Sequence, residues 1–240
     1  MRILSKNDPK AILIDLDDTV VADDAVHEKA WKGVFKKPAF QECEFNITKL
    51  RSIIKKTGDW YYSDPERNRR ARQNLPAARR EVVSISLSSL GIDDPKLAYK
   101  LADSYGIEKE KAIFVYPGAI ETIRYFKNHG VLLALVTNGS SEFQRRKIER
   151  FGLTPYFDYI LIEGEFGIGK PDKRLFKHAL DQLKVDPSEV WMVGDRLEHD
   201  IGGAQSIGIY AIWIDWRGEG LPKSSDVQPD RIIRTLSELL

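Results

Sequence analysis

The sequence predicts an α/β fold, in which a three-layer parallel-sheet core carries a smaller all-helical domain. A short continuous apolar run at residues 11–16 (AILIDL) is typical of a strand covered on both faces. From about residue 113 onward, helical and strand patterns alternate, which is the order that builds a parallel sheet with right-handed crossovers. We therefore expect a core formed by residues 1–22 and 113–240 and a helical cap domain, residues 23–112, inserted after the first strand.

The inserted segment shows helical periodicity and no convincing strand pattern. "AVHEKAWKGVF" and "ITKLRSIIKKT" carry apolar residues at spacings of three and four. Two later apolar segments are followed by glycines, Gly91 and Gly106, and each glycine is predicted to end a helix. The segment is therefore expected to be a helical domain with its own core.

The C-terminal part alternates four times between helix and strand. The expected helices cover residues 117–130, 140–152, 172–184 and 199–208, and the expected strands cover residues 131–139, 156–164, 190–195 and 210–215. Because strands joined by crossover helices run parallel, their carboxyl ends should lie along one edge of the sheet.

The composition narrows the class of protein. The 240 residues include 37 Lys and Arg against 36 Asp and Glu, a balance that argues against a nucleic-acid partner or a membrane surface. The single cysteine, Cys43, cannot form an internal disulfide and fits a reducing compartment. No apolar run reaches the roughly 18 residues of a membrane span, and no leader pattern is seen. We expect a cytoplasmic monomer or homodimer.

An acidic cluster follows the first strand. Asp15, Asp17 and Asp18 lie within four positions. Neighbouring carboxylates raise one another's pKa unless a cation or a proton lies between them. The cluster therefore indicates a site that handles a cation, a proton or both, with Asp18 expected to be a turn residue.

Polar residues also follow the other predicted strands. In an open parallel sheet, ligands bind beyond the carboxyl ends of the strands, so these side chains should meet. They are Asp15, Asp17 and Thr19 after the first strand, Thr137 and Asn138 after the next, Lys170 in a later loop and Asp195 after "VWMV". Carboxylate oxygens suit Mg²⁺, and the remaining groups suit a phosphoryl group.

The order of these residues resembles the four motifs of the haloacid-dehalogenase (HAD) superfamily. The motifs are D-x-D-x-T at residues 15–19, T-N at 137–138, K-P at 170–171 and G-D-x4-D at 194–200. The insertion after the first motif resembles the helical cap of the first HAD subclass. The resemblance implies a Rossmann-like core and Mg²⁺-dependent hydrolysis through an aspartyl-phosphate.

The resemblance also implies a role for each motif residue. Asp15 is the expected nucleophile, and Asp17 is the expected general acid and base. Thr137 and Asn138 are expected to donate to phosphoryl oxygens, whose charge Lys170 would neutralise. The predicted metal group consists of Asp15, Asp17, Asp195 and Asp200.

We interpret the chain as a phosphatase for a small phosphorylated metabolite, such as a sugar phosphate or a nucleotide. A 2-haloacid dehalogenase is the nearest alternative, but a halide leaves without a proton and that reaction needs no metal, so Asp17 and Asp195 favour phosphate. A phosphomutase and a non-catalytic binding module are further alternatives. Substrate selection is expected in the cap, where six arginines lie close to Trp60, Tyr61 and Tyr62. Most of these arginines are expected to form a solvated face.

Overall fold

The computed structural model describes residues 8–41 and 46–240. Cys43 lies outside the described residues. The chain forms two compact units: unit 1 comprises Met1–Ala22 and Phe114–Leu240, and unit 2 comprises Asp23–Ile113.

Unit 1 is built on a six-stranded sheet with the order β5-β4-β1-β6-β7-β8, in which every neighbouring pair is parallel. The strands are β1 (Ala11–Ile14), β4 (Leu132–Thr137), β5 (Tyr159–Ile162), β6 (Val190–Gly194), β7 (Tyr210–Ile214) and β8 (Arg231–Ile233). Strand β1 lies between β4 and β6, so the residues that follow these three strands lie side by side. The predicted parallel sheet is confirmed, and β8 extends it by a strand that the sequence pattern did not predict.

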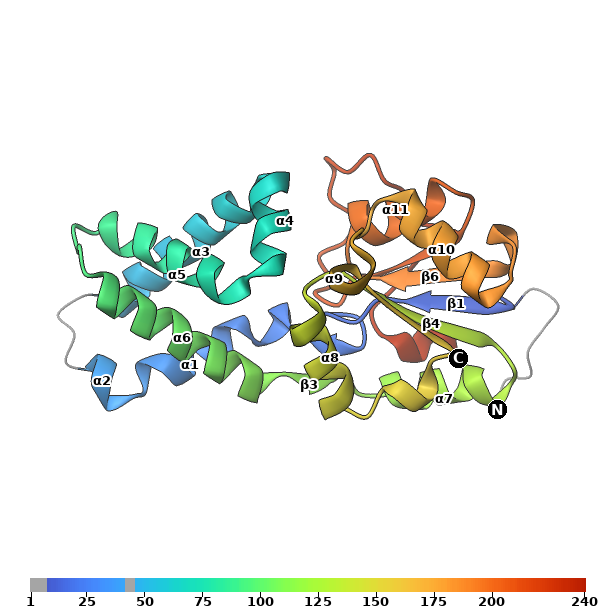
Figure 1. Ribbon diagram of the computed structural model, residues 1–240, viewed down its shortest axis with the longest axis horizontal. Coiled ribbons are helices and arrows are strands. Elements are labelled where there is room, and N and C mark those ends of the chain that lie inside the picture. The colour runs from blue at the N-terminus through green and yellow to red at the C-terminus, as the bar shows by residue number, and fades with distance from the viewer. Residues whose placement is uncertain (1–7, 42–45) are drawn as a thin grey trace. The chain divides into compact units, whose positions relative to one another are not determined.

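Helices cover both faces of this sheet, with α10 and α11 on one side and α7 on the other (Figure 1). The helices are α7 (Ala119–Asn128), α8 (Ser141–Arg150), α9 (Glu163–Phe166), α10 (Lys173–Leu183) and α11 (Gly203–Gln205), with a π-helix at Leu197–Gly202. Short 3-10 turns lie at Thr154–Tyr156, Pro187–Glu189 and Leu236–Leu239. Leu175 and Phe176 of α10 belong to one buried cluster with Leu13 of β1. On the opposite face, Phe126 of α7 contacts Trp191 of β6 edge-on. The core of unit 1 thus has the three layers that the sequence predicts.

Unit 2 is all-helical within residues 23–41 and 46–113. A 3-10 turn (Asp24–Val26) leads into α1 (His27–Phe35), α2 (Pro38–Gln41), α3 (Ile47–Ser63), α4 (Pro65–Gln73), α5 (Leu75–Ser88) and α6 (Pro95–Ala112). Side-chain caps begin four of these helices: Asn46, Asp64, Asn74 and Asp94 each accept a backbone N–H three residues later. Trp31, Leu50 and Leu101 lie in its buried core.

The predicted helix end at Gly106 is wrong, because α6 continues through this glycine to Ala112. A Cβ atom built on Gly106 would lie 3.1 Å from Nη1 of Arg79 on α5. The glycine therefore lies inside α6 beside the end of the flexible Arg79 side chain and does not end the helix. Gly91, by contrast, follows α5 with a left-handed φ of +77°, which a glycine adopts readily.

Two short strands join the chain on either side of the insertion. Strand β2 (Val21–Ala22) pairs antiparallel with β3 (Phe114–Val115), so that Ala22 lies opposite Phe114. Both strands belong to unit 1. Two-residue strands leave little periodic signal, and the sequence did not predict this pair.

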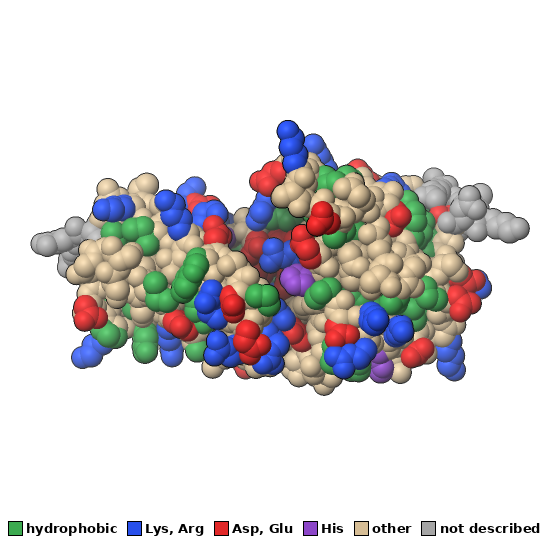
Figure 2. All heavy atoms as spheres, turned by 90° about the horizontal axis from the view of Figure 1, so that it is seen from above, with side chains coloured by type: hydrophobic (Ala, Val, Ile, Leu, Met, Phe, Trp, Pro, Cys, Tyr) green, Lys and Arg blue, Asp and Glu red, His purple; other side chains and the backbone are tan. Residues whose placement is uncertain are grey.

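The surface carries both signs of charge. Figure 2 shows Lys and Arg side chains interspersed with Asp and Glu across the face in view, in keeping with a net charge of +1. Among the described residues, no helix combines the length and the apolar character that crossing a membrane requires.

Candidate active site

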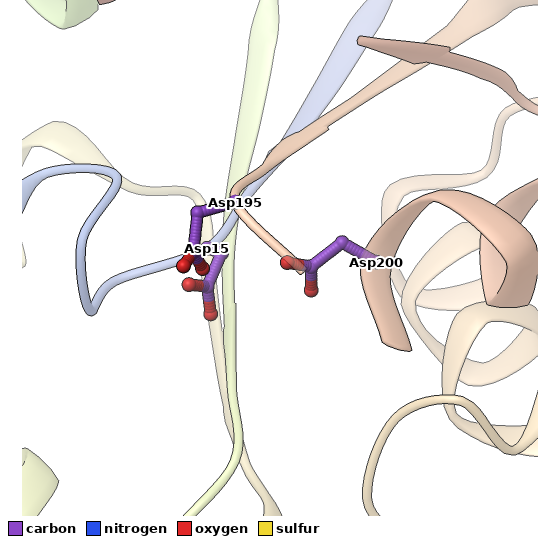
Figure 3. A group of neighbouring side chains, drawn as sticks. All are labelled: Asp15, Asp195 and Asp200. Atoms are coloured by element: carbon purple, nitrogen blue, oxygen red, sulfur yellow. The ribbon is translucent and has the colours of Figure 1, made fainter. Parts of the chain in front are cut away.

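Three carboxylates meet beyond the carboxyl ends of the central strands of unit 1. Asp15 follows β1, and its backbone N–H donates to Val193 O of β6 at 2.9 Å. Asp195 follows β6, and Asp200 lies in the π-helix. One oxygen from each carboxylate lies within 4.8 Å of the others, and Figure 3 shows Asp200 directed toward Asp15 and Asp195.

A glycine makes room for the third carboxylate. A Cβ atom at Gly194 would lie 2.3 Å from Oδ2 of Asp200, which is too close for any side chain. The same oxygen accepts the backbone N–H of Arg196 at 2.9 Å. The glycine of the G-D motif and the turn after it therefore place Asp200, which is fully buried.

Lys170 lies against this group. Its Nζ donates to Asp15 Oδ1 at 2.5 Å and to Val136 O at 2.8 Å. It also forms an ion pair with Asp200 Oδ1 at 2.7 Å. Burial by itself would lower the pKa of Lys170, but the Asp15 and Asp200 carboxylates raise it overall, so the side chain is an ammonium.

Burial and mutual repulsion raise the pKa of two of these carboxylates, Asp15 and Asp195. Burial raises the pKa of Asp15 to about 7, against the opposing effect of Lys170, and Asp200 and Asp17 add to the increase. Burial, Asp15 and Asp200 also hold the pKa of Asp195 well above its ordinary value. When ionised, the three carboxylates carry three negative charges, of which the Lys170 ammonium neutralises one, and the other nearby cation is the exposed Arg196, which lowers the pKa of Asp195. A divalent cation with oxygen ligands fits this donor set in both charge and chemistry.

The T-N motif lies at the end of β4 beside Lys170. Thr137 is buried, as a side chain at the end of a covered strand should be. The Asn138 side chain accepts Lys170 N–H through Oδ1 at 2.8 Å and donates to Lys170 O through Nδ2 at 2.9 Å. Asn138 therefore holds the loop that carries Lys170, a task that the motif alone did not indicate.

Asp17, predicted in the metal group, lies outside the group of three carboxylates that the described residues form. Its Oδ1 accepts from Lys147 Nζ at 2.6 Å, and its Oδ2 accepts from Gln144 Nε2 at 3.0 Å. Asp18 adopts a left-handed φ of 57° and donates its N–H to Val21 O at 2.6 Å, as a turn residue does.

Gln144 and Lys147 were not predicted from the sequence. Both lie on α8, whose buried side chains are Gln144 and Ile148, four residues apart. A polar residue on the buried stripe of a helix needs a hydrogen-bond partner, and that was the available signal.

The comparisons with known proteins identify one family. The family profile described as haloacid dehalogenase-like hydrolase matches residues 9–208. The chain is 31% identical to a phosphoserine phosphatase of Thermus thermophilus, over 96% of this chain and 97% of that protein. It is 28% identical to a glyceraldehyde 3-phosphate phosphatase of Methanocaldococcus jannaschii, over 96% and 95% of the two chains.

Solved structures share the fold over nearly the whole chain. The HAD hydrolase YfnB of Bacillus subtilis, solved with magnesium bound, has a TM-score of 0.75 at 23% identity and covers 97% of each chain. A 2-haloacid dehalogenase of Pseudomonas syringae has a TM-score of 0.60 at 29% identity and covers 96% of each chain. The ordered motifs, the three-layer core and these matches identify the chain as a member of the haloacid dehalogenase-like hydrolase family.

Proposed function

We propose that the chain is a Mg²⁺-dependent phosphatase that hydrolyses a small phosphorylated metabolite through an aspartyl-phosphate. The observation that carries the proposal is the group of Asp15, Asp195 and Asp200, in which Asp15 and Asp200 are buried against Lys170 and the three carboxylates, when ionised, carry more negative charge than this lysine neutralises. The phosphatase names of the relatives over most of the chain support the same chemistry.

In the first step, one carboxylate oxygen of Asp15 forms a bond to phosphorus while the bond from phosphorus to the leaving oxygen breaks. Asp17 gives a proton to that oxygen. In the second step, Asp17 takes a proton from water, the water oxygen attacks phosphorus, and the bond to Asp15 breaks. The net change is hydrolysis of a phosphate monoester to an alcohol and phosphate.

The other site residues would stabilise the transferred group. Lys170 and the Thr137 hydroxyl are donors for phosphoryl oxygens, and the Asn138 side chain keeps the Lys170 loop in place. Mg²⁺, held by Asp15, Asp195 and Asp200, would neutralise phosphoryl charge and orient the group. Phosphoryl transfer depends mainly on this kind of positioning and charge neutralisation.

The 2-haloacid dehalogenase reading leaves several residues without a task. A halide leaves without protonation, so Asp17 would have no role as a general acid. The dehalogenase reaction also needs no metal, so Asp195 and Asp200 would have no ion to bind. Relatives of both kinds occur at similar identity. The cluster of Asp15, Asp195 and Asp200, and not overall sequence similarity, therefore favours a phosphatase over a dehalogenase.

We further propose that unit 2 is the cap and selects the substrate. Several arginines in it contact side chains of their own unit: Arg67 lies 4.3 Å from the Trp60 ring centroid, and Arg80 pairs with Asp103 at 2.8 Å. Because these arginines contact side chains of their own unit, they support the expectation that most arginines of unit 2 form a solvated face and have a structural role.

A substrate panel tests the proposal. We expect Mg²⁺-dependent phosphate release from at least one of phosphoserine, glyceraldehyde 3-phosphate, sugar phosphates and nucleoside monophosphates, with no halide release from 2-haloacids. Halide release that persists in excess chelator would establish the dehalogenase instead. Movement of the phosphate within a sugar without release would indicate a phosphomutase.

A further inference from the structure

Helix α8 reaches the site through two side chains that neither the HAD motifs nor the proposed roles include. We infer that Gln144 and Lys147 are positioning residues: together they fix the carboxyl group of Asp17, and Gln144 also orients the Thr137 hydroxyl. The inference rests on the proposed function, because it concerns the residues expected to protonate the leaving group and to hold the phosphoryl group.

Gln144 is 2% exposed, and its Nε2 lies between three acceptors. The distances from Nε2 are 3.0 Å to Asp17 Oδ2, 2.6 Å to Thr137 Oγ1 and 2.9 Å to Asn138 O. The carbonyl of Asn138 can only accept, so the atom facing this cluster must be the amide nitrogen. The amide has two hydrogens for these three acceptors, so at least one hydrogen is shared, and one buried amide ties the first motif to the second.

The bond to Thr137 has a consequence for its hydroxyl. Because Thr137 Oγ1 accepts from Gln144 at 2.6 Å, its own O–H must point elsewhere. Its acceptor within the chain is Asn138 O at 3.3 Å, a long hydrogen bond. Gln144 thus leaves the Thr137 hydroxyl as a donor that a closer phosphoryl oxygen can accept.

Lys147 completes the hold on Asp17. Its Nζ lies 2.6 Å from Asp17 Oδ1, and the two side chains are 14% and 29% exposed. Each carboxylate oxygen of Asp17 therefore receives a donor from α8. Rotation of the carboxyl group is restrained on both sides, by contacts that span more than 120 residues of sequence.

Helix α8 is itself fixed within unit 1. Ser140 caps its first turn, accepting from Phe143 N–H. Arg145 forms two hydrogen bonds of 2.7 Å with Glu165 of α9, and Ser141 donates to the same carboxylate. These contacts tie α8 to α9 within unit 1, so the helix is held in place where Gln144 and Lys147 meet Asp17.

The decisive comparison is between Lys147→Met and Arg146→Met. Both variants replace a cation on α8 by the same apolar side chain, but Arg146 pairs with Glu142 on its own helix. For the Lys147 variant we expect kcat on an alkyl phosphate to fall on the order of 10²-fold with little change in KM, as misplacement of a catalytic group by about 1 Å can do. Phosphoenzyme formation from nitrophenyl phosphate should fall much less, because that leaving group needs no proton.

Two further variants complete the test. Lys147→Arg should recover most of the lost alkyl-phosphate activity, since it restores a cationic donor to Asp17. Gln144→Met should lower the rate of phosphoenzyme formation with both substrates, because it also removes the hydrogen bond that orients the Thr137 hydroxyl. Thermal unfolding of each variant separates these effects from loss of the fold, and if Gln144→Met does not fold, the Lys147 variants decide.

The inference is overturned if the folded Lys147→Met protein keeps at least half of the wild-type turnover of the alkyl phosphate, or if phosphoenzyme formation falls equally with the alkyl and the nitrophenyl substrate. Arg146→Met should stay within about twofold of the wild type, and an equal loss there would also overturn it. Mg²⁺-dependent hydrolysis by the wild-type protein is measured first. Its absence would reject the proposed function itself, whereas failure of the variant contrast would reject only the role of α8.

Discussion

The two units differ in the polar and charged side chains that they bury. Among the described residues, unit 2 fully buries one polar side chain, Ser86, whose hydroxyl donates to Val82 O of its own helix. Unit 1 buries many more, several of them charged. They are Asp15, Asp18, Thr19, Thr122, Thr137, Gln144, Lys170, Asp200 and Asp215. Buried charges are costly unless they are paired or hold a metal, so their concentration marks unit 1 as the part of the molecule organised for a reaction.

The interior of unit 2 is organised for packing. The Trp31 and Tyr105 rings stack with centroids 4.6 Å apart, and Leu50 and Leu101 are fully buried. Its ionic contacts, such as the 2.5 Å pair of Lys109 and Asp23, keep some solvent exposure. Substitution of Asp15 or Asp200 in unit 1 should therefore act first on the reaction, whereas changes in the core of unit 2 should act first on stability.

The largest expected effect is that of Asp15→Asn. The proposed covalent step has no substitute nucleophile, so turnover should fall by at least about 10³-fold. The protein should remain folded, because the change removes a buried charge from a group that is already short of counterions. Steady-state kinetics and circular dichroism check both points, and retention of a tenth of the wild-type turnover with an intact fold would contradict the assignment.

Metal removal should have a comparably large effect on turnover. Chelation should stop hydrolysis and Mg²⁺ should restore it, whereas Ca²⁺, with its looser coordination, should restore much less. Mg²⁺ binding should also raise the melting temperature. At a Mg²⁺ concentration of 100 times the dissociation constant, it should add about 2.7 kcal/mol to the free energy of unfolding. Full activity in excess chelator would contradict this prediction.

A matched pair of variants locates the metal. Asp195→Asn should lose the Mg²⁺-dependent rise in melting temperature. Asp215→Asn is the control, since Asp215 follows the neighbouring strand β7 but accepts the backbone N–H groups of Glu219 and Gly220. This control should keep the Mg²⁺ response, and equal loss in both variants would show that the response does not report on the group of three carboxylates.

Asp17→Asn should have a smaller and more selective effect. General acid catalysis contributes roughly 10²–10⁴-fold, mainly for poor leaving groups, so alkyl phosphates should suffer most. With nitrophenyl phosphate, rapid mixing should reveal a burst followed by slow turnover, since breakdown of the intermediate lacks its base. Equal losses in the burst and the steady state for both substrate types would leave Asp17 with a structural role only.

The smallest expected effect concerns unit 2 and pH. Burial lowers the pKa of His27, whose Nδ1 lies 2.8 Å from Tyr105 Oη, below its ordinary value of 6.5. The unfolded chain therefore takes up this proton first as the pH falls. The free energy of unfolding should decrease below about pH 6.5, by at most about 1.4 kcal/mol per pH unit. Denaturant unfolding of His27→Gln should show a shallower decline, and an unchanged slope would contradict the prediction.

The sequence predicts the part of the site that follows from strand order. Apolar runs locate β1, β4 and β6, and because these strands are adjacent and parallel, Asp15 and Asp195 necessarily meet beyond their ends. Local pattern is sufficient there because each residue directly follows a recognisable element.

What the sequence did not predict depends on contacts between distant segments or on very short elements. Lys147 meets Asp17 across 130 positions, and no local pattern indicates which carboxylate a lysine on a helix will reach. Gly106 has the spacing of a helix stop, yet the packing of α5 against α6 overrides it. Strand β8 has only three residues, and of these Ile233 is buried. A strand of this length is too short to show a period-two pattern.

The pairing of β2 with β3 makes the insertion modular. Ala22 and Phe114 are directly opposed in an antiparallel pair, so their Cα atoms are about 5 Å apart although 91 residues separate them in the chain. A two-residue Asn-Gly turn can close such a pair as a hairpin. Replacement of unit 2 by such a turn is therefore expected to leave the strand order that assembles the carboxylates unchanged.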